Sequence, residues 1–287
     1  MITANMIKEL RERTSAGMTD CKNALTESNG DMEAAADWLR KKGIVKAAKK
    51  ADRVAASGLV ATAQSGGTAI VVEVNAETDF VAKNDKFLNL VSQATEAALA
   101  HNGDFDKVAD VIKDELTNTI ATVGENMNLR RIATVTGDAV FTYVHNAIAP
   151  KMGQIGVIVA FNGDADKLAD IGPKVAMHIA ASKPDFLSVA DVDPAAVERE
   201  KKIFIESGAT NGKPAEVAEK MVNGRVQKYY GESVLEEQPF VMDPSKTVKA
   251  VVAEAGGKIA GFALYVLGDG IVKPEDNLAD EVAKLVG

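Results

Sequence analysis

An internal repeat constrains the fold of this chain more than any other feature of its sequence. A shift of 87 residues places the apolar residues 70–75 on residues 157–162. In each copy, short β-branched runs come before apolar residues at helical spacing, which is typical of two strands followed by a helix. Because a unit of this size needs a neighbour to bury its apolar face, we expect each copy to cover the other or to extend its sheet.

The residues before the repeat show a pattern that is typical of a small helical module. Apolar residues of residues 1–52 recur at helical spacing, and residues 14–17 interrupt that spacing. Asp31 is placed to accept the first amide hydrogens of a third helix, and Gly43 is expected to end that helix. A second helical region is inserted into the second copy of the repeat, where Pro194 and Pro214 each mark a helix start. We expect these two helices to form an antiparallel hairpin.

The sequence therefore predicts an α+β fold, in which a strand-strand-helix core is duplicated. Its expected parts are a three-helix module (residues 1–52), a first core subdomain (54–140), a second core subdomain (141–186 and 231–267), an inserted helical hairpin (187–230) and a C-terminal module with one short helix (268–287).

Composition and missing motifs narrow the functional class. The chain is 46% hydrophobic and 26% charged, without a membrane-length apolar run or a signal-peptide layout, so we expect a cytoplasmic protein. A lone cysteine, Cys21, excludes an internal disulfide and is expected to be a buried thiol. No phosphate-binding loop, dinucleotide fingerprint or hydrolase motif occurs, and the three histidines are scattered. We expect a protein without enzymatic activity, metal or cofactor.

A basic segment stands out in an acidic chain. The net charge is −8, yet residues 40–53 contain seven lysine and arginine residues. Such a segment is either a solvated linker or a nucleic-acid patch. Because no aromatic side chains are interleaved to stack on bases, the linker is favoured. The alternative function is an RNA-binding translation or assembly protein that uses this segment.

The strongest candidate site is a corner after an apolar strand. Asp79 and Phe80 lie between that strand and a helix expected to begin at Val81. In the second copy, Asp166 and Lys167 occupy the corner, so the fold does not require an aromatic there, and the shared aspartate is expected to cap both helices. Alternatively, Phe80 is a core residue of its helix.

Two motifs carry a family resemblance. Residues 10–25 read LRERTSAGMTDCKNAL and residues 73–83 read EVNAETDFVAK. Both resemble the signatures of the elongation factor Ts family, in the order in which that family has them. Its members release GDP from elongation factor Tu. The resemblance implies a ubiquitin-associated-like fold for the helical module, which would dock on the partner's G domain.

The resemblance also implies roles for individual residues. Thr78, Asp79, Phe80 and Val81 would displace the partner's Mg²⁺. Further partner contacts would come from Met18, Val123, Gly124 and, by a weaker match, His145. The expected partner is elongation factor Tu, in its GDP-bound and nucleotide-free forms, with no membrane and no direct nucleic-acid contact. A homodimer, or an assembly of two copies of each protein through the helical hairpin, stays open.

Overall fold

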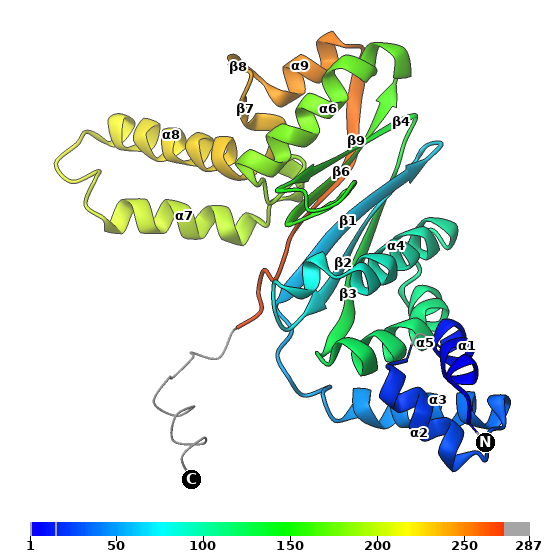
Figure 1. Cartoon of the computed structure of the whole chain (residues 1–287). Coiled ribbons are helices and arrows are strands. Elements are labelled where there is room, and N and C mark those ends of the chain that lie inside the picture. The colour runs from blue at the N-terminus through cyan, green and yellow to red at the C-terminus, as the bar shows by residue number, and fades with distance from the viewer. Residues whose placement is uncertain (1, 15, 273–287) are drawn as a thin grey trace. The chain divides into compact units, whose positions relative to one another are not determined.

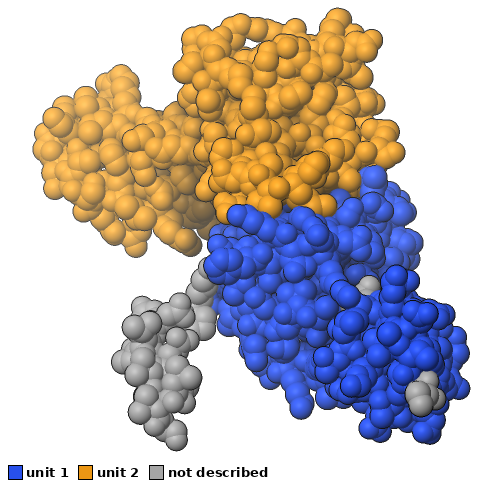
Figure 2. All heavy atoms as spheres, in the orientation of Figure 1, with its two compact units in different colours: residues 1–60, 72–131, 266–287 blue, residues 61–71, 132–265 orange. Residues whose placement is uncertain are grey.

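The computed structural model describes residues 2–14 and 16–272, and its fold is α+β, as the sequence predicts (Figure 1). The chain forms two compact units, coloured separately in Figure 2. Of the described residues, unit 1 comprises 2–14, 16–60, 72–131 and 266–272, and unit 2 comprises 61–71 and 132–265. In the part of the chain that the structure describes, no helix has the length and apolar character needed to cross a membrane.

Three helices form the N-terminal module, in agreement with the sequence prediction. They are α1 (Ala4–Thr14), α2 (Met18–Glu27) and α3 (Met32–Ala48). Leu10, Cys21 and Leu25 lie fully buried in its small core, so the thiol is structural, as expected. Asp31 caps α3, because its side chain accepts hydrogen bonds from the amides of Glu33 and Ala34.

The prediction that Gly43 ends α3 is wrong. The helix continues to Ala48, and Gly43 lies buried where α3 packs against the later helix α5 (Phe105–Val123). A Cβ at Gly43 would sit 3.7 Å from the Cβ of Ala121. A Cβ would therefore fit at ordinary van der Waals distance, so the glycine lies in a packed helix–helix contact that does not require it. Local sequence does not distinguish this use of a mid-helix glycine from a helix end.

The first copy of the repeat contains one hairpin, two helices and a returning strand. Gly66 and Gly67 form the two-residue turn of the hairpin, as predicted, and Gly66 has a φ of +54°. The elements are β1 (Ser57–Ser65), β2 (Thr68–Ala76), the 3₁₀ helix η1 (Val81–Lys83), α4 (Asp85–Ala100), α5 and β3 (Met127–Thr136).

The second copy begins with paired strands and a helix in the same order, and the helical hairpin is inserted after that helix. Its core elements are β4 (Ala139–His145), β5 (Met152–Gly153), β6 (Ile155–Gly163), α6 (Ala165–Ser182), β7 (Pro239–Phe240), β8 (Asp243–Thr247), α9 (Val248–Glu254) and β9 (Gly257–Val266). The strand order is β3-β2-β1-β5 in one sheet and β4-β6-β9 in another. Helix α6 packs on β4 and β6, and it buries Leu168, Val175 and Ile179 there.

The 87-residue shift superposes the central strands β2 and β6 but not the outer strands or the starts of the helices. It maps β2 onto β6 from end to end. Asp164 alone separates β6 from α6, whereas residues 77–84 separate β2 from α4. The expected caps are also wrong. Asn84 caps α4 by accepting from the Lys86 amide, and Asp164, not Asp166, caps α6. The first copy thus carries an additional segment at the candidate corner.

The inserted hairpin consists of α7 (Pro194–Glu206) and α8 (Ala215–Ser233), the yellow-green and yellow helices in Figure 1. Pro194 opens α7 and Pro214 precedes α8, as the sequence predicts. Val197 and Val226 are buried near the base of the hairpin, beside Val192 and Val234. The C-terminal helix predicted within residues 268–287 lies outside the described residues.

Candidate functional site

The candidate corner exposes one aromatic side chain between anchored neighbours. Phe80 is 84% exposed, whereas Val81 and Ala82 are 5% and 2% exposed. Phe80 is therefore not a core residue, and the alternative raised for it is wrong. Val81 instead buries its side chain in the 3₁₀ turn η1. Because leaving a phenylalanine in water forgoes roughly 1.5 to 3 kcal/mol of burial, the position is costly unless a partner covers it.

Asp79 adds a free carboxylate to the same corner. Its side chain is exposed and makes no hydrogen bond or ion pair with any residue that the structure describes. Its backbone carbonyl accepts the Ala82 amide at 3.2 Å, which closes the turn. The helix that follows is capped by Asn84, so Asp79 is not required as a cap. The carboxylate is available to interact with a partner.

Glu125 holds the corner from the side. One carboxylate oxygen accepts the backbone N–H of Thr78 at 2.9 Å, and the other accepts the Thr78 hydroxyl at 2.7 Å. Glu125 lies in the turn after α5, directly after Val123 and Gly124. Hydrogen bonds to an ionised acceptor are stronger than neutral ones. The turn and the corner are thereby tied together, and the structure brings Val123 and Gly124 close to Thr78.

A buried charge cluster lies at the end of β2, a few residues before the corner. Glu73 is fully buried, and its carboxylate accepts from Arg131 Nε at 2.6 Å, Arg130 Nη1 at 3.0 Å and the Gly268 amide at 2.9 Å. Burial by itself raises the pKa of Glu73, but the hydrogen bonds from Gly268, Asn75 and the two arginines outweigh it and hold the pKa below its usual value.

The two arginines also bind the chain that follows β9. Arg131 donates to the Val266 carbonyl and Arg130 to the Asp269 carbonyl. The cluster therefore fastens residues 266–269 to β2 and β3 within unit 1. We did not anticipate this role from the sequence. The available signal was an acid inside an otherwise apolar strand, together with an arginine pair in a later strand.

The other two predicted contact residues are exposed and lie elsewhere in the chain. Met18 is the first residue of α2 and is 57% exposed. His145 is the last residue of β4, in unit 2, and its Nδ1 lies 3.1 Å from the Tyr143 hydroxyl. Both side chains are accessible to a partner. Their roles as contacts stay predictions.

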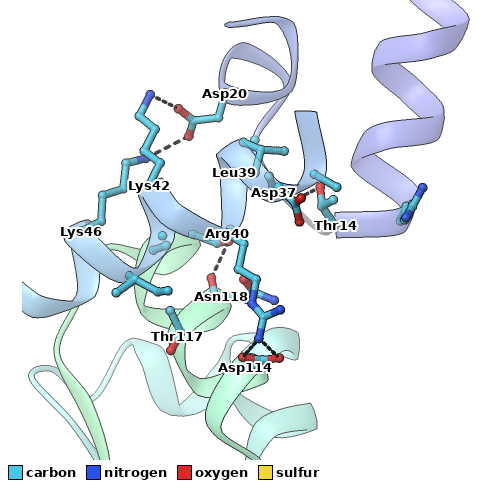
Figure 3. Close-up of a pocket in the computed structure, with 18 of the residues that line it drawn as sticks. Thr14, Asp20, Asp37, Leu39, Arg40, Lys42, Lys46, Asp114, Thr117 and Asn118 are labelled. Atoms are coloured by element: carbon cyan, nitrogen blue, oxygen red, sulfur yellow. Dashed lines mark hydrogen bonds and ion pairs between the residues drawn. The ribbon is translucent and has the colours of Figure 1, made fainter. Parts of the chain in front are cut away.

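The basic segment is not a linker, contrary to the sequence prediction. Its first nine residues belong to α3, and most of its charges are paired within unit 1 (Figure 3). Lys42 and Lys46 both bind Asp20, at 3.1 and 2.9 Å, and Arg40 binds Asp114 at 3.0 Å. These pairs border a cavity of about 340 Å³ between the helical module and α5.

Two further basic side chains that have partners follow α3 in the sequence. Lys50 donates to the Gly124 carbonyl, and Arg53 lies 3.6 Å from Glu77. Five of the seven basic side chains of residues 40–53 thus have partners inside the chain. A phosphate backbone would have to compete with these partners, so the structure does not favour the RNA-binding alternative.

Fold and site together define an α+β protein with a preformed loop, residues 77–84, that exposes an aromatic side chain and a free carboxylate. A family model described as Elongation factor TS matches residues 77–269. Proteins called Elongation factor Ts from Paracoccus denitrificans and Caulobacter vibrioides are 52% and 50% identical to this chain. The alignments cover 99% and 100% of this chain and 98% of each relative. The chain belongs to the elongation factor Ts family.

Proposed function

We propose that this protein is a guanine-nucleotide exchange factor, which binds elongation factor Tu in its GDP-bound form and promotes release of GDP. The family supplies the partner. The observation that carries the proposal is the corner, where Phe80 is 84% exposed while the next two residues are buried. A large apolar side chain held out from a rigid support is suited to enter an apolar site on a second protein.

The proposed mechanism needs no bond chemistry in this chain. A G protein holds GDP partly through a Mg²⁺ ion that bridges phosphate and protein oxygens. Insertion of Phe80 would displace the loop that supplies those oxygens. The free Asp79 carboxylate, an oxygen ligand of the kind that Mg²⁺ prefers, would act beside it. Loss of the ion weakens GDP binding, and GTP can then load.

The remaining predicted residues would supply affinity. Met18 on the helical module, and Val123 and Gly124 beside the corner, would contact the partner's G domain, whereas His145 would contact a different domain. Because these contacts belong to one chain, each raises the effective concentration of the next. By linkage, if the factor weakens GDP binding, GDP weakens binding of the factor to the same extent.

Release of labelled GDP from elongation factor Tu tests the proposal. A catalytic amount of the protein should accelerate release under conditions in which free Mg²⁺ is buffered. Raising the Mg²⁺ concentration should slow the stimulated reaction, because displacement of the ion is the proposed step. If GDP leaves at the same rate with and without the protein, the proposal is wrong.

The helical hairpin is the proposed surface for self-association. Beyond the Glu200–Arg225 ion pair, Ile203, Ile205 and Val217 are 54%, 49% and 42% exposed. Replacing residues 203–222 with a short flexible linker removes these side chains and retains the buried base of the hairpin. We expect the shortened protein to melt like the wild type and to sediment as a monomer where the wild type sediments as a dimer. A wild-type protein that is monomeric at micromolar concentration would contradict self-association.

A further inference from the structure

Three segments that are distant in the sequence converge behind the exposed corner. Glu125 binds both hydrogen-bond donors of Thr78, and Glu77 accepts the Asn126 amide at 2.5 Å. The Asn126 side chain in turn donates to the carbonyls of Ala51 and Arg53, at 3.2 and 2.7 Å. All these residues lie in unit 1. The corner, the turn after α5 and the segment after α3 therefore form one network.

The network reaches the helical module through a short connection. Residues 49–53 follow α3 directly, and Lys50 donates to the Gly124 carbonyl at 2.5 Å. Gly124 ends α5 in the left-handed conformation, with a φ of +90°. That conformation turns its carbonyl and the following two residues away from the helix axis. Lys50 and Asn126 thus attach the turn to the chain that leaves the module.

We propose that Glu125 is a positioning residue for nucleotide exchange, and that Asn126 and Lys50 couple its position to the helical module. This inference rests on the proposed exchange function. Residues 77–84 have no counterpart in the second copy of the repeat, so the sheet does not require them to take one conformation. Val81 and Ala82 anchor the segment after Phe80 by burial, and Glu125 restrains it before Phe80 by binding Thr78 at both donors. Phe80, two residues further on, is thereby held in its exposed position before the partner arrives.

The chemistry of the pair makes the inference testable with conservative variants. Glu125→Ala removes both acceptors. Glu125→Gln keeps one oxygen for the Thr78 amide, and its NH₂ can donate to the Thr78 hydroxyl, which accepts as well as donates. Glu125→Gln should therefore keep most of the restraint on Thr78 that Glu125→Ala loses. Asp110→Ala is the matched control, because Asp110 is an exposed acid on α5 that makes no hydrogen bond or ion pair with any described residue.

The first measurement is GDP release from elongation factor Tu at increasing concentrations of each full-length variant. We expect Glu125→Ala to lower the maximal rate about tenfold, since small misplacements of a positioned group can cost this much or more. The concentration for half-maximal rate should change little, because the other contacts remain. Glu125→Gln and Asp110→Ala should stay within about threefold of the wild type. An alanine variant with the wild-type maximal rate would overturn the inference.

The second measurement needs no partner. Hydrogen exchange of the Thr78 amide in the free protein should accelerate about tenfold or more in Glu125→Ala and stay slow in Asp110→Ala. If the alanine variant does not fold, Thr78→Val is used, because it removes only the hydroxyl donor. Faster exchange of the backbone amide at position 78 in the free protein supports the restraint, since this readout needs no contact with the partner, and unchanged exchange would overturn it. If the wild type itself does not accelerate GDP release, the proposed function fails, and Thr78 exchange still reports whether Glu125 restrains the corner.

Coupling to the module is measured by a double-mutant cycle. Lys50→Met keeps the length of the side chain and removes its donor to Gly124. If the network acts as a unit, the effects of Lys50→Met and Glu125→Ala on the maximal rate should be less than multiplicative. When Lys50→Met is combined with Asp110→Ala, the two effects on the maximal rate should multiply. If Lys50→Met and Glu125→Ala act independently on the maximal rate, Lys50 does not couple the helical module to Glu125.

Discussion

Phe80→Ala is expected to slow GDP release from elongation factor Tu about 10- to 100-fold, while the melting temperature of the free protein stays nearly unchanged. The side chain is 84% exposed in the free protein, so truncating it removes almost no internal packing. Burial of a phenylalanine in a partner is worth roughly 1.5 to 3 kcal/mol, which corresponds to about this change in rate if the burial occurs in the exchange step.

Phe87→Ala, in the helix that follows, is expected to destabilise the free protein, unlike Phe80→Ala. Phe87 is fully buried on α4, and truncating a buried phenylalanine costs about 3 to 5 kcal/mol of stability. A thermal melt of each free variant, set beside its stimulation of GDP release, separates the two roles. A Phe80→Ala protein that melts much earlier, or one that releases GDP at the wild-type rate, would show that the corner is scaffold.

Glu73→Ala is expected to lower the free energy of unfolding by about 3 to 5 kcal/mol, because it leaves two partly buried arginines without their shared anion. It also removes the acceptor of the Gly268 amide. Urea denaturation of the variant and the wild type measures the difference. Glu206→Ala is the control, since this carboxylate belongs to an exposed pair with Lys202, and removing it should change stability by less than about 1 kcal/mol.

The Glu73 cluster also predicts how stability depends on pH. The folded-state pKa of Glu73 lies below its usual value of 4.5, so folding favours the ionised carboxylate. The stabilisation is complete above that usual value and is lost as the pH falls through the folded-state pKa. Stability of the wild type should therefore drop at acid pH, whereas Glu73→Ala should show a shallower drop. Parallel pH profiles of the two proteins would contradict the assignment.

Features that depend on a few neighbouring residues could be predicted from the sequence. Asp31 caps α3, the Gly66–Gly67 pair closes the hairpin, and Pro194 opens α7. The repeat was equally accessible, because each copy carries its own apolar runs. In each case the residue types and their spacing restrict the backbone directly. For Phe80 the sequence left an exposed and a core position open, and comparison with the second copy does not decide between them, because residues 77–84 have no counterpart there.

The sequence predictions were wrong where the local sequence is compatible with two different structures. Gly43 fits a helix end as well as the middle of a packed helix, and α3 continues through it and packs on α5. Asp79, Asn84 and Asp85 are all able to cap a helix, and the backbone placed Asn84 in the extended conformation that a cap needs. The basic residues 40–53 suggested a linker because their partners, such as Asp114 and Gly124, lie some seventy residues away.

The sequence by itself determined the fold class, the repeat and the helical hairpin, because short-range periodicity and turn chemistry encode them. Only the tertiary structure decided what holds residues 77–84. Thr78 finds Glu125, and Glu73 finds Arg130, Arg131 and Gly268, across separations of 47 to 195 residues. A charged side chain offers the same hydrogen bonds to many partners in a sequence, and the fold selects among them by bringing one set within reach and burying it away from water.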